Sequence, residues 1–543
     1  MKKLLLLLIT VLILSLSACT KPKEDVYVFF TSDVHCGIDE NLGFGAVKAL
    51  VDETKAEGKN VVLVDAGDFL QGGTIGSMSQ GQDIIDIMNK MNYDVVTFGN
   101  HEFDYGMDRL AELMEQADFQ MAACNVRYTG NQRNIFEHVP AYVMKDFNGT
   151  KVAFLGILTP DSLTTSTPAF FMEDGRFVYD FYSGNDGNDL AVKVQETVDE
   201  ARKQGADYVV AISHLGSSAA VAPHDSVSLI SKTTGIDAVI DGHSHSIISG
   251  DLYPNANGED VLLASVGTKM QNLGELIIAA DGSISCVLIS EYDKTDEEID
   301  AAIASVNEKL DQVLAQKIGE LDFTLRISDE NGIRQVRSRE TNLGDFVADA
   351  FRDHLQTDVV VFNGGSIRKN IEAGDVTYGD FLNVTPFGNT AASCYATGQQ
   401  ILDVLEFCSR STESINYFED GPVGESGAFL QVSGLSYTID TSIPSGVLTD
   451  EDGMYMGIEG ERRIRDVMIL ENGKYVPIDP EKIYTVGGTD YVLFQRGDGN
   501  SVFYNNERII ANGALDVDVL IAYFNSLESF EEYREPQGRI TIR

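Results

Sequence analysis

The sequence is poor in basic residues relative to acidic ones. Its 543 residues include 40 lysines and arginines against 84 aspartates and glutamates, which gives a formal net charge of −44. A field of this sign repels nucleic acid and anionic lipid headgroups. We therefore expect no nucleic-acid partner and no membrane contact through the folded surface. An anionic substrate then needs a local site of positive charge, made by metal ions or arginines.

Cysteine and histidine are both scarce. Beyond Cys19 the cysteines are odd in number and irregularly spaced, at Cys36, Cys124, Cys286, Cys394 and Cys408. Such a pattern indicates neither a disulfide framework nor a cysteine-type zinc site. We interpret these five as small buried side chains.

Long apolar runs are missing apart from one at the N-terminus. There a positively charged tripeptide precedes an apolar stretch over residues 4–14, which is short for a transmembrane helix and typical of a signal peptide. The tetrad Leu16–Cys19 resembles a lipobox, which predicts a lipidated Cys19; a plain secretory signal is the alternative. Residues 1–18 are then the signal peptide and 19–25 the lipidated cysteine and its tether. We expect an exported protein that is anchored to the cell membrane by its lipid alone.

The chain is long enough for two domains. Over residues 26–294 short apolar runs alternate with amphipathic stretches, which is typical of a layered α/β domain. Residues 295–322 lack a strand pattern, and Asp296 can cap a helix there, so we expect a connecting helix. Residues 323–543 form a second α/β domain. The predicted strands are Val26–Phe30, Val61–Val64, Val95–Phe98, Met121–Cys124, Val152–Leu158, Tyr208–Ile212, Ala238–Ile240, Val261–Ala264, Val359–Phe362, Val432–Ile439 and Tyr484–Gly487.

Five strands of the first domain each run into a short polar motif. These motifs are Thr31–His35, Asp65–Asp68, Gly99–Glu102, Ser213-His214 and Asp241–His245. Because ligand sites in open α/β sheets form at the carboxyl ends of strands, we expect their side chains to converge. Five of the eight histidines lie in these motifs, beside aspartate and asparagine, which packing alone explains poorly.

The candidate ligands offer imidazole nitrogen and carboxylate or amide oxygen, with no thiolate. Such donors suit Zn, Mn, Mg, Co or Fe, and the residue types do not choose among them. Seven candidates exceed what one ion needs, whereas two divalent ions about 3.5–4 Å apart that share a carboxylate fit the number.

Asp-x-His, Gly-Asp, Gly-Asn-His-Glu, His and Gly-His-x-His, in this order along the chain, resemble the motifs of the calcineurin-like metallophosphoesterases. The whole mature chain, second domain included, resembles the 5′-nucleotidase / UDP-sugar hydrolase family in a lipoprotein form. The resemblance implies an N-terminal layered αββα metallophosphoesterase domain and a C-terminal α/β nucleotide-binding domain. It also implies that Asp33, His35 and His245 hold one metal, that Asn100, His214 and His243 hold the other, and that Asp68 bridges them.

The same resemblance implies that His101 and Asp104 form a catalytic dyad. Asp104 follows His101 by three residues, within reach if the turn is helical. A carboxylate beside an imidazole raises its pKa and supports its charged form. His101 then stabilises charge that develops on the phosphoryl group or assists the leaving oxygen. Glu102 is expected to give structural support.

The second domain carries the residues that the resemblance implies in substrate binding. Arg337 and Arg368 are expected on phosphate oxygens, because guanidinium forks match phosphate. Phe387 is expected to stack on the base, and Asn363 and Asn389 to make polar contacts.

A later segment, 488–499, is expected to complete the substrate site. Tyr491 is implied as the second ring of an aromatic sandwich, and Asp498 as a contact to ribose hydroxyls. The segment departs from the family pattern, since Arg496 replaces a glycine and the link to the following Gly-Asp-Gly is one residue longer. Phe494 is therefore a rival of Tyr491 for the stacking role.

These features predict hydrolysis of nucleoside 5′-phosphates to nucleoside and phosphate, by a hydroxide held between the two metals. Alternative substrates of the same site are 2′,3′-cyclic nucleotides and the pyrophosphate of UDP-sugars or dinucleotides. A non-catalytic nucleotide-binding lipoprotein is a hypothesis of another class, and it would not need the full ligand set. The resemblance further implies that the second domain rotates on the connecting helix. The sequence predicts no oligomeric state.

Overall fold

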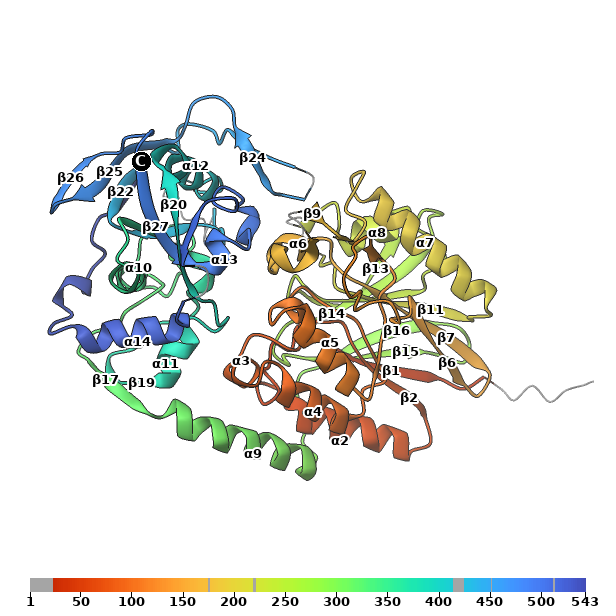
Figure 1. The fold of residues 1–543 in the computed structure, drawn as a ribbon. Coiled ribbons are helices and arrows are strands. Elements are labelled where there is room, and N and C mark those ends of the chain that lie inside the picture. Colours follow the sequence, from red (N-terminus) through yellow and green to blue (C-terminus); the bar gives the residue numbers. More distant parts are fainter. Residues whose placement is uncertain (1–22, 174–175, 218–220, 414–423, 451, 511–512) are drawn as a thin grey trace, which may run out of the picture.

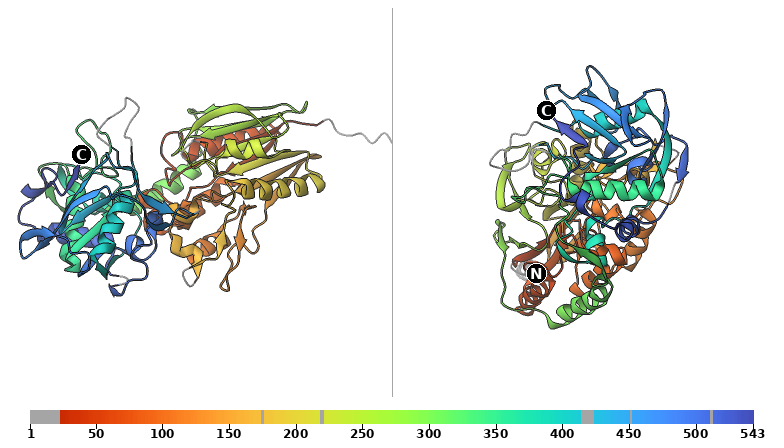
Figure 2. Two further views of the ribbon diagram at one scale, coloured as in Figure 1. Left: turned by 90° about the horizontal axis from the view of Figure 1, so that it is seen from above. Right: turned by 90° about the vertical axis from the view of Figure 1, so that its left-hand side faces the viewer.

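The computed structural model describes residues 23–173, 176–217, 221–413, 424–450, 452–510 and 513–543. The predicted signal peptide and Cys19 lie outside these residues, so both stay predictions. Two bodies lie side by side, with helix α9 (Glu297–Leu314) below them in Figure 1. The view from above in Figure 2 shows the same arrangement. Among the described helices, none has the length and apolar character needed to cross a membrane.

The first body contains two six-stranded sheets. The first sheet has the order β16 (Ile284–Ile289), β15 (Leu273–Ile278), β1 (Val26–Thr31), β2 (Asn60–Asp65), β3 (Val95–Val96), β4 (Gln120–Met121). The second has the order β13 (Ile247–Pro254), β14 (Asp260–Val266), β12 (Ala238–Asp241), β11 (Tyr208–Ser213), β7 (Thr150–Ile157), β6 (Tyr142–Phe147). Strands β1 to β4 pair in parallel, as do β7, β11, β12 and β14. Each sheet therefore brings the carboxyl ends of its parallel strands to one edge.

Apolar side chains fill the space between the two sheets and the space under the outer helices. Because successive strand residues face opposite ways, Val28 and Phe30 join the cluster between the sheets, while Phe29 joins the cluster under the helices. Helices α2 (Gly43–Ala56), α4 (Gln82–Met91) and α5 (Met107–Gln116) cover the first sheet, and α7 (Asn188–Lys203) and α8 (Ser226–Lys232) cover the second. The four layers confirm the predicted αββα fold.

The connecting helix is shorter than predicted. Asp296 caps α9 by accepting hydrogen bonds from the backbone N–H groups of Glu298 and Ile299, each at 3.0 Å. The helix ends at Leu314, and Lys317–Leu321 forms strand β17, antiparallel to β19 (Gly374–Thr377). The helical assignment of 295–322 was therefore wrong at its end. A glycine inside a helix costs about 1 kcal/mol, and at Gly319 the ladder to β19 offers the backbone other hydrogen bonds.

The second body is a mixed α/β domain whose larger sheets have five and four strands. A five-stranded sheet has the order β21 (Leu430–Ser433), β18 (Val359–Asn363), β27 (Ile483–Thr489), β20 (Ala391–Thr397), β28 (Arg508–Ile510). A four-stranded sheet has the order β26 (Lys474–Pro477), β25 (Ile464–Glu471), β22 (Leu435–Ile439), β29 (Ile540–Ile542). Helices α10 (Asn342–Leu355), α11 (Tyr378–Val384), α12 (Gly398–Cys408) and α14 (Asp516–Ser526) pack around them.

The single strand predicted over Val432–Ile439 is two strands in different sheets. Gly434 divides β21 from β22 with a φ of +74°, a backbone conformation that side chains with a Cβ rarely adopt. A Cβ at this position would lie 2.1 Å from the carbonyl oxygen of Asp358, so only glycine fits the turn.

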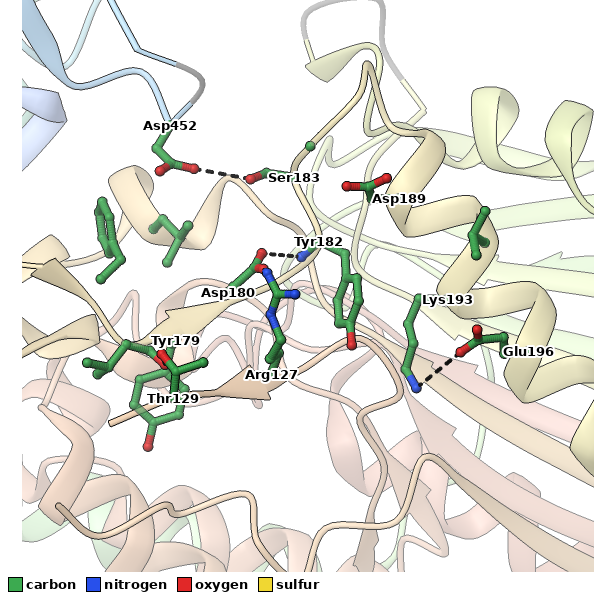
Figure 3. Close-up of a pocket in the computed structure, with 15 residues that line it drawn as sticks. Arg127, Thr129, Tyr179, Asp180, Tyr182, Ser183, Asp189, Lys193, Glu196 and Asp452 are labelled. Carbon is green, nitrogen blue, oxygen red and sulfur yellow. Dashed lines mark hydrogen bonds and ion pairs between the residues drawn. The ribbon is translucent and has the colours of Figure 1, made fainter. Parts of the chain in front are cut away.

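Hydrogen bonds join the two bodies on both sides of the space between them. Ser77 donates to the carbonyl oxygen of Pro386 at 2.7 Å, and the backbone N–H of Ala169 donates to the carbonyl oxygen of Gln495 at 3.2 Å. Beyond them, the hairpin of β23 (Val447–Thr449) and β24 (Tyr455–Ile458) reaches the first domain, where Ser183 donates to Asp452 at 3.1 Å (Figure 3). These contacts hold the ends of the first domain's parallel strands opposite the second domain.

Candidate active site

The loops after β1, β2, β3, β11 and β12 bring the seven candidate metal ligands together. The structure forms one group of ligand atoms from Asp33, His35 and His245 and another from Asp68, His214 and His243, with atoms within 4.8 Å of one another in each. Five of the seven adopt the left-handed backbone region that residues with a Cβ rarely occupy, and such strain is concentrated at functional sites. The five are Asp33, His35, Asp68, His243 and His245.

The first group presents free imidazole nitrogens to one point. His35 donates from Nδ1 to the carbonyl oxygen of Gln71 at 2.9 Å, which leaves its Nε2 as an acceptor. This Nε2 lies 3.1 Å from Nε2 of His245, which in turn lies 3.7 Å from Oδ1 of Asp33. Burial lowers the pKa of His35 to about 3, so the ring is neutral, as a metal ligand must be. The group fits a cation better than it fits a hydrogen-bond network.

The second group shares its carboxylate with the first. Oδ2 of Asp68 lies 3.1 Å from Nε2 of His214 and 3.7 Å from Nε2 of His35. A carboxylate placed in this way could contact a metal ion in each group. His214 donates from Nδ1 to the carbonyl oxygen of Ala66 at 2.6 Å, so its Nε2 also faces the group.

Three buried polar atoms at this centre lack a hydrogen-bond partner among the described residues. They are Oδ2 of Asp33, Oδ1 of Asn100 and Nε2 of His214. A buried polar atom left unpaired costs about 1–3 kcal/mol, so a cluster of them at one centre calls for a ligand. All three are donors to metals, and a pair of divalent cations would satisfy them.

Glu102 supports this centre from behind, as the sequence suggested. Its carboxylate is 1% exposed and accepts backbone hydrogen bonds from Asp68 at 2.8 Å, Phe69 at 2.9 Å, Leu70 at 3.2 Å and Gly99 at 2.6 Å. It therefore ties the loop after β2 to the loop after β3. The relative positions of Asp68 and the neighbouring Asn100 depend on this one side chain.

His101 and Asp104 form the predicted pair at the edge of the centre. A 3-10 turn, η1 (His101–Phe103), brings Nδ1 of His101 to 2.6 Å from Oδ2 of Asp104, so that the imidazole donates to the carboxylate. Burial alone would lower the pKa of His101, but Asp104 and Asp68 outweigh it and raise the pKa to about 9. The ring is therefore protonated at neutral pH, with Nε2–H free to donate to a substrate.

A cavity of about 520 Å³ lies between the two domains and opens onto the metal ligands. From the first domain it is lined by His101 and Asp104 and by the ligands Asp68, Asn100, His243 and His245. All seven predicted substrate-binding residues line it from the other side: Arg337, Asn363, Arg368, Phe387, Asn389, Tyr491 and Asp498. Residues predicted separately in two domains therefore meet at one space.

Positive charge in the cavity comes from three arginines. Burial and, to a lesser extent, the positive charges of Arg337 and Arg334 lower the pKa of Arg368 to about 10. The three guanidinium groups therefore lie close enough to influence one another. Nε of Arg337 is buried with no hydrogen-bond partner among the described residues, and the Arg368 guanidinium lies 5.5 Å from the Phe387 ring centroid. Arg334 was missed by the sequence reasoning. Its guanidinium donates to the two carboxylate oxygens of Glu425 at 2.5 and 2.7 Å. Because the two residues are 91 positions apart, the local sequence does not indicate this pair.

In the segment with the irregular spacing, Tyr491 and not Phe494 is the aromatic residue that faces the cavity. Tyr491 lines the cavity, whereas Phe494 is 4% exposed in the core of the second domain. Gly497 makes room for the tyrosine, since a Cβ there would lie 2.2 Å from its ring. Asp498 accepts a hydrogen bond from Nδ2 of Asn363 at 3.2 Å, and both residues face the cavity.

A second cavity, of about 450 Å³, lies behind the contact between Ser183 and Asp452 (Figure 3). Among the described residues that line it there is no predicted site residue. Its two cations are each paired with a carboxylate, Arg127 with Asp180 and Lys193 with Glu196. It lacks the metal-ligand groups of the first cavity and the cluster of three arginines, so we do not assign the chemistry to it.

Comparison with known proteins divides the chain in the same way. Residues 26–246 match the family model of calcineurin-like phosphoesterases, and residues 317–505 match that of the 5′-nucleotidase C-terminal domain. The first match contains all seven metal-ligand candidates and the second contains all seven substrate-binding candidates.

Two relatives and a solved structure agree with this division. The chain is 26% identical over 562 residues to a 5′-nucleotidase of Vibrio parahaemolyticus, covering 94% of this chain and 91% of that one. It is 29% identical over 532 residues to the trifunctional nucleotide phosphoesterase protein YfkN of Bacillus subtilis, covering 89% of this chain but only 33% of that longer protein. The crystal structure of a 5′-nucleotidase precursor from Thermus thermophilus superposes with a TM-score of 0.72 at 25% identity, covering 95% of this chain and 99% of that one. With both family models matched in order and two sites for divalent cations in place, the chain belongs to the 5′-nucleotidase family of metal-dependent phosphoric-ester hydrolases.

Proposed function

We propose that the protein hydrolyses nucleoside 5′-phosphates to nucleoside and inorganic phosphate in the cavity between its domains. The observation that carries the proposal is that one cavity of about 520 Å³ is lined by metal ligands on one side and by arginines and aromatic rings on the other. A phosphate group fits the first side and a nucleoside the second. The excess of acidic residues elsewhere makes this local positive charge necessary.

The metal ions have a defined place in the proposal. Asp33, His35 and His245 would hold one, Asn100, His214 and His243 would hold the other, and Asp68 would contact both. When bound, such ions polarise phosphoryl oxygens and supply a nucleophile at neutral pH by lowering the pKa of water.

The chain's own residues would bind and orient the substrate. Arg337 and Arg368 would donate charge-assisted hydrogen bonds to phosphate oxygens, Arg337 from a half-buried position and Arg368 from the exposed rim of the cavity. Phe387 and Tyr491 offer aromatic faces to the base, and Asp498 accepts hydrogen bonds from the ribose hydroxyls.

His101 would donate a proton or a hydrogen bond during the reaction. Its Nδ1–H is fixed on Asp104, so Nε2–H points away from that carboxylate toward the cavity. From there it stabilises the negative charge that develops on a phosphoryl oxygen or protonates the leaving O5′.

Phosphate release from AMP, ADP, ATP, UDP-glucose and the 3′,5′- and 2′,3′-cyclic forms of AMP tests the proposal, with each substrate assayed under several divalent metals. We expect AMP to give the highest kcat/KM and complete chelation to remove all activity. Preferential hydrolysis of UDP-glucose or of 2′,3′-cyclic AMP would replace the proposed substrate with one of the two alternatives. UDP-glucose is chemically reasonable because Arg334 adds a third cation to the cavity. Tight AMP binding with no hydrolysis under any metal would favour a binding protein and contradict the proposal.

We also propose that the protein acts outside the cytoplasm, held by a lipid on Cys19. The support is the charged, apolar and small-residue pattern that precedes this cysteine. In the host cell the wild-type protein is expected in the membrane fraction, whereas Cys19→Ser is expected to remain uncleaved or to leave that fraction. Equal fractionation of both forms, with the same N-terminus after Edman sequencing, would contradict the lipid anchor.

A further inference from the structure

Ser166 lines the cavity between the domains, and no metal or substrate role was predicted for it. It follows the short helix α6 (Ser162–Thr165) and is 2% exposed. Its hydroxyl donates to Oδ1 of Asp104 at 3.1 Å. Buried hydroxyls in a polar cavity wall need a partner, and here the partner is the carboxylate that holds His101.

This hydrogen bond fixes the orientation of the Asp104 carboxylate. Oδ2 already accepts from Nδ1 of His101 at 2.6 Å, and Ser166 occupies the other oxygen. A carboxylate held through one oxygen can turn about its terminal bond, whereas one held through both has a single orientation. Because the imidazole follows the carboxylate, the direction of Nε2–H depends on both bonds.

The segment that carries Ser166 is itself held on two sides. Phe171, at the end of η2 (Pro168–Phe171), packs against Phe103 of η1 with ring centroids 5.0 Å apart, beside His101 itself. On the other side, the backbone N–H of Ala169 donates to the carbonyl oxygen of Gln495 in the second domain. Ser166 is therefore presented to Asp104 from a fixed backbone, which is what a preorganised site requires.

We propose that Ser166 is a positioning residue for the reaction, acting through Asp104 on His101; the proposal rests on the proposed function of that pair. Ser166 itself touches neither the metal ligands nor the base-binding residues by any hydrogen bond to the described residues. It completes a hydrogen-bonded series of three side chains, Ser166 to Asp104 to His101, through which it orients the imidazole.

Steady-state kinetics of Ser166→Ala, Ser166→Thr and Thr164→Ala with AMP tests the proposal. Ser166→Ala is expected to lower kcat about ten- to one-hundredfold, the factor that corresponds to one hydrogen bond to a charged group, with KM and the two bound metals unchanged. Ser166→Thr keeps the hydroxyl and is expected to restore most of the rate. Thr164→Ala removes a hydroxyl from the neighbouring helix α6 that donates to the carbonyl oxygen of Asp161, and it is expected to behave as wild type.

A double-mutant cycle separates positioning from a structural role. In an Asp104→Ala background, Ser166→Ala is expected to cost nothing further in kcat, because its partner is absent. Additive losses in the cycle, or a Ser166→Ala enzyme with wild-type kcat, would overturn the proposal. If instead Asp104→Ala itself keeps full activity, the proposed role of the dyad fails; if wild type releases no phosphate from AMP, the proposed function fails. These outcomes are distinguishable.

Discussion

Replacing Asp68 by asparagine is expected to lower the rate of phosphate release from AMP by at least about a thousandfold, the loss that follows from removing several kcal/mol of charge stabilisation. Asp68 faces both ligand groups, through His214 at 3.1 Å and His35 at 3.7 Å, and its distance to His214 is shorter than the 4.0 Å that separates Asp33 from the same ring. Its other oxygen accepts from the backbone N–H of His101 at 2.8 Å, so the side chain cannot turn away. An amide removes the negative charge that two cations would share.

Metal content distinguishes this explanation from simple unfolding. We expect the Asp68→Asn protein to unfold cooperatively but to retain fewer than two metal ions per chain after dialysis. Asp86→Asn, in the exposed face of α4, is the matched control and should keep both metals and full activity. An Asp68→Asn enzyme with wild-type turnover would remove the basis for a shared bridging carboxylate.

Turnover is expected to fall at alkaline pH, and the position of this fall is expected to depend on Asp104. Asp104 and Asp68 together raise the pKa of His101 to about 9 against the effect of burial. A raised imidazole pKa means that the charged form is present below that value and is lost as the pH rises through it. We therefore expect kcat to be sustained at neutral pH and to fall on the alkaline side, at or below pH 9, since bound cations would neutralise part of the Asp68 charge.

In Asp104→Asn the hydrogen-bonding partner stays while its charge is lost. The pKa of His101 should fall, so the alkaline limb moves toward neutral pH and kcat decreases about 10²- to 10⁴-fold, the range for losing general acid–base help. Metal content and KM are expected to be unchanged, because Asp104 is not in either ligand group. Asp108→Asn, in the exposed first turn of α5, serves as the control. A pH profile of kcat that is the same in Asp104→Asn and wild type would contradict the assigned role of the pair.

The metal centre could be predicted from the sequence because its residues follow strands directly. Asp33, Asp68 and His214 each lie within three residues of a strand that reads as a short apolar run, and parallel strands deliver their ends to one edge. The pairing of His101 with Asp104 was equally local, since it needs only one turn of 3-10 helix.

Other parts could not be predicted because they depend on contacts between distant segments. Arg334 is held by Glu425, and Ser166 reaches Asp104 only because Phe171 packs on Phe103. That Tyr491 lines the cavity while Phe494 is buried in the core likewise depends on tertiary packing, which the local sequence does not reveal. The errors in element bounds have structural causes too: pairing with the distant strand β19 ended the connecting helix early, and Gly434 divided one apolar run between two sheets.

Diffraction from crystals of the metal-loaded protein, recorded at the absorption edge of the bound metal, tests the central claim most directly. The account predicts two anomalous peaks per chain with Asp68 between them, one enclosed by Asp33, His35 and His245 and the other by Asn100, His214 and His243. A single peak, or two peaks away from these side chains, would contradict it.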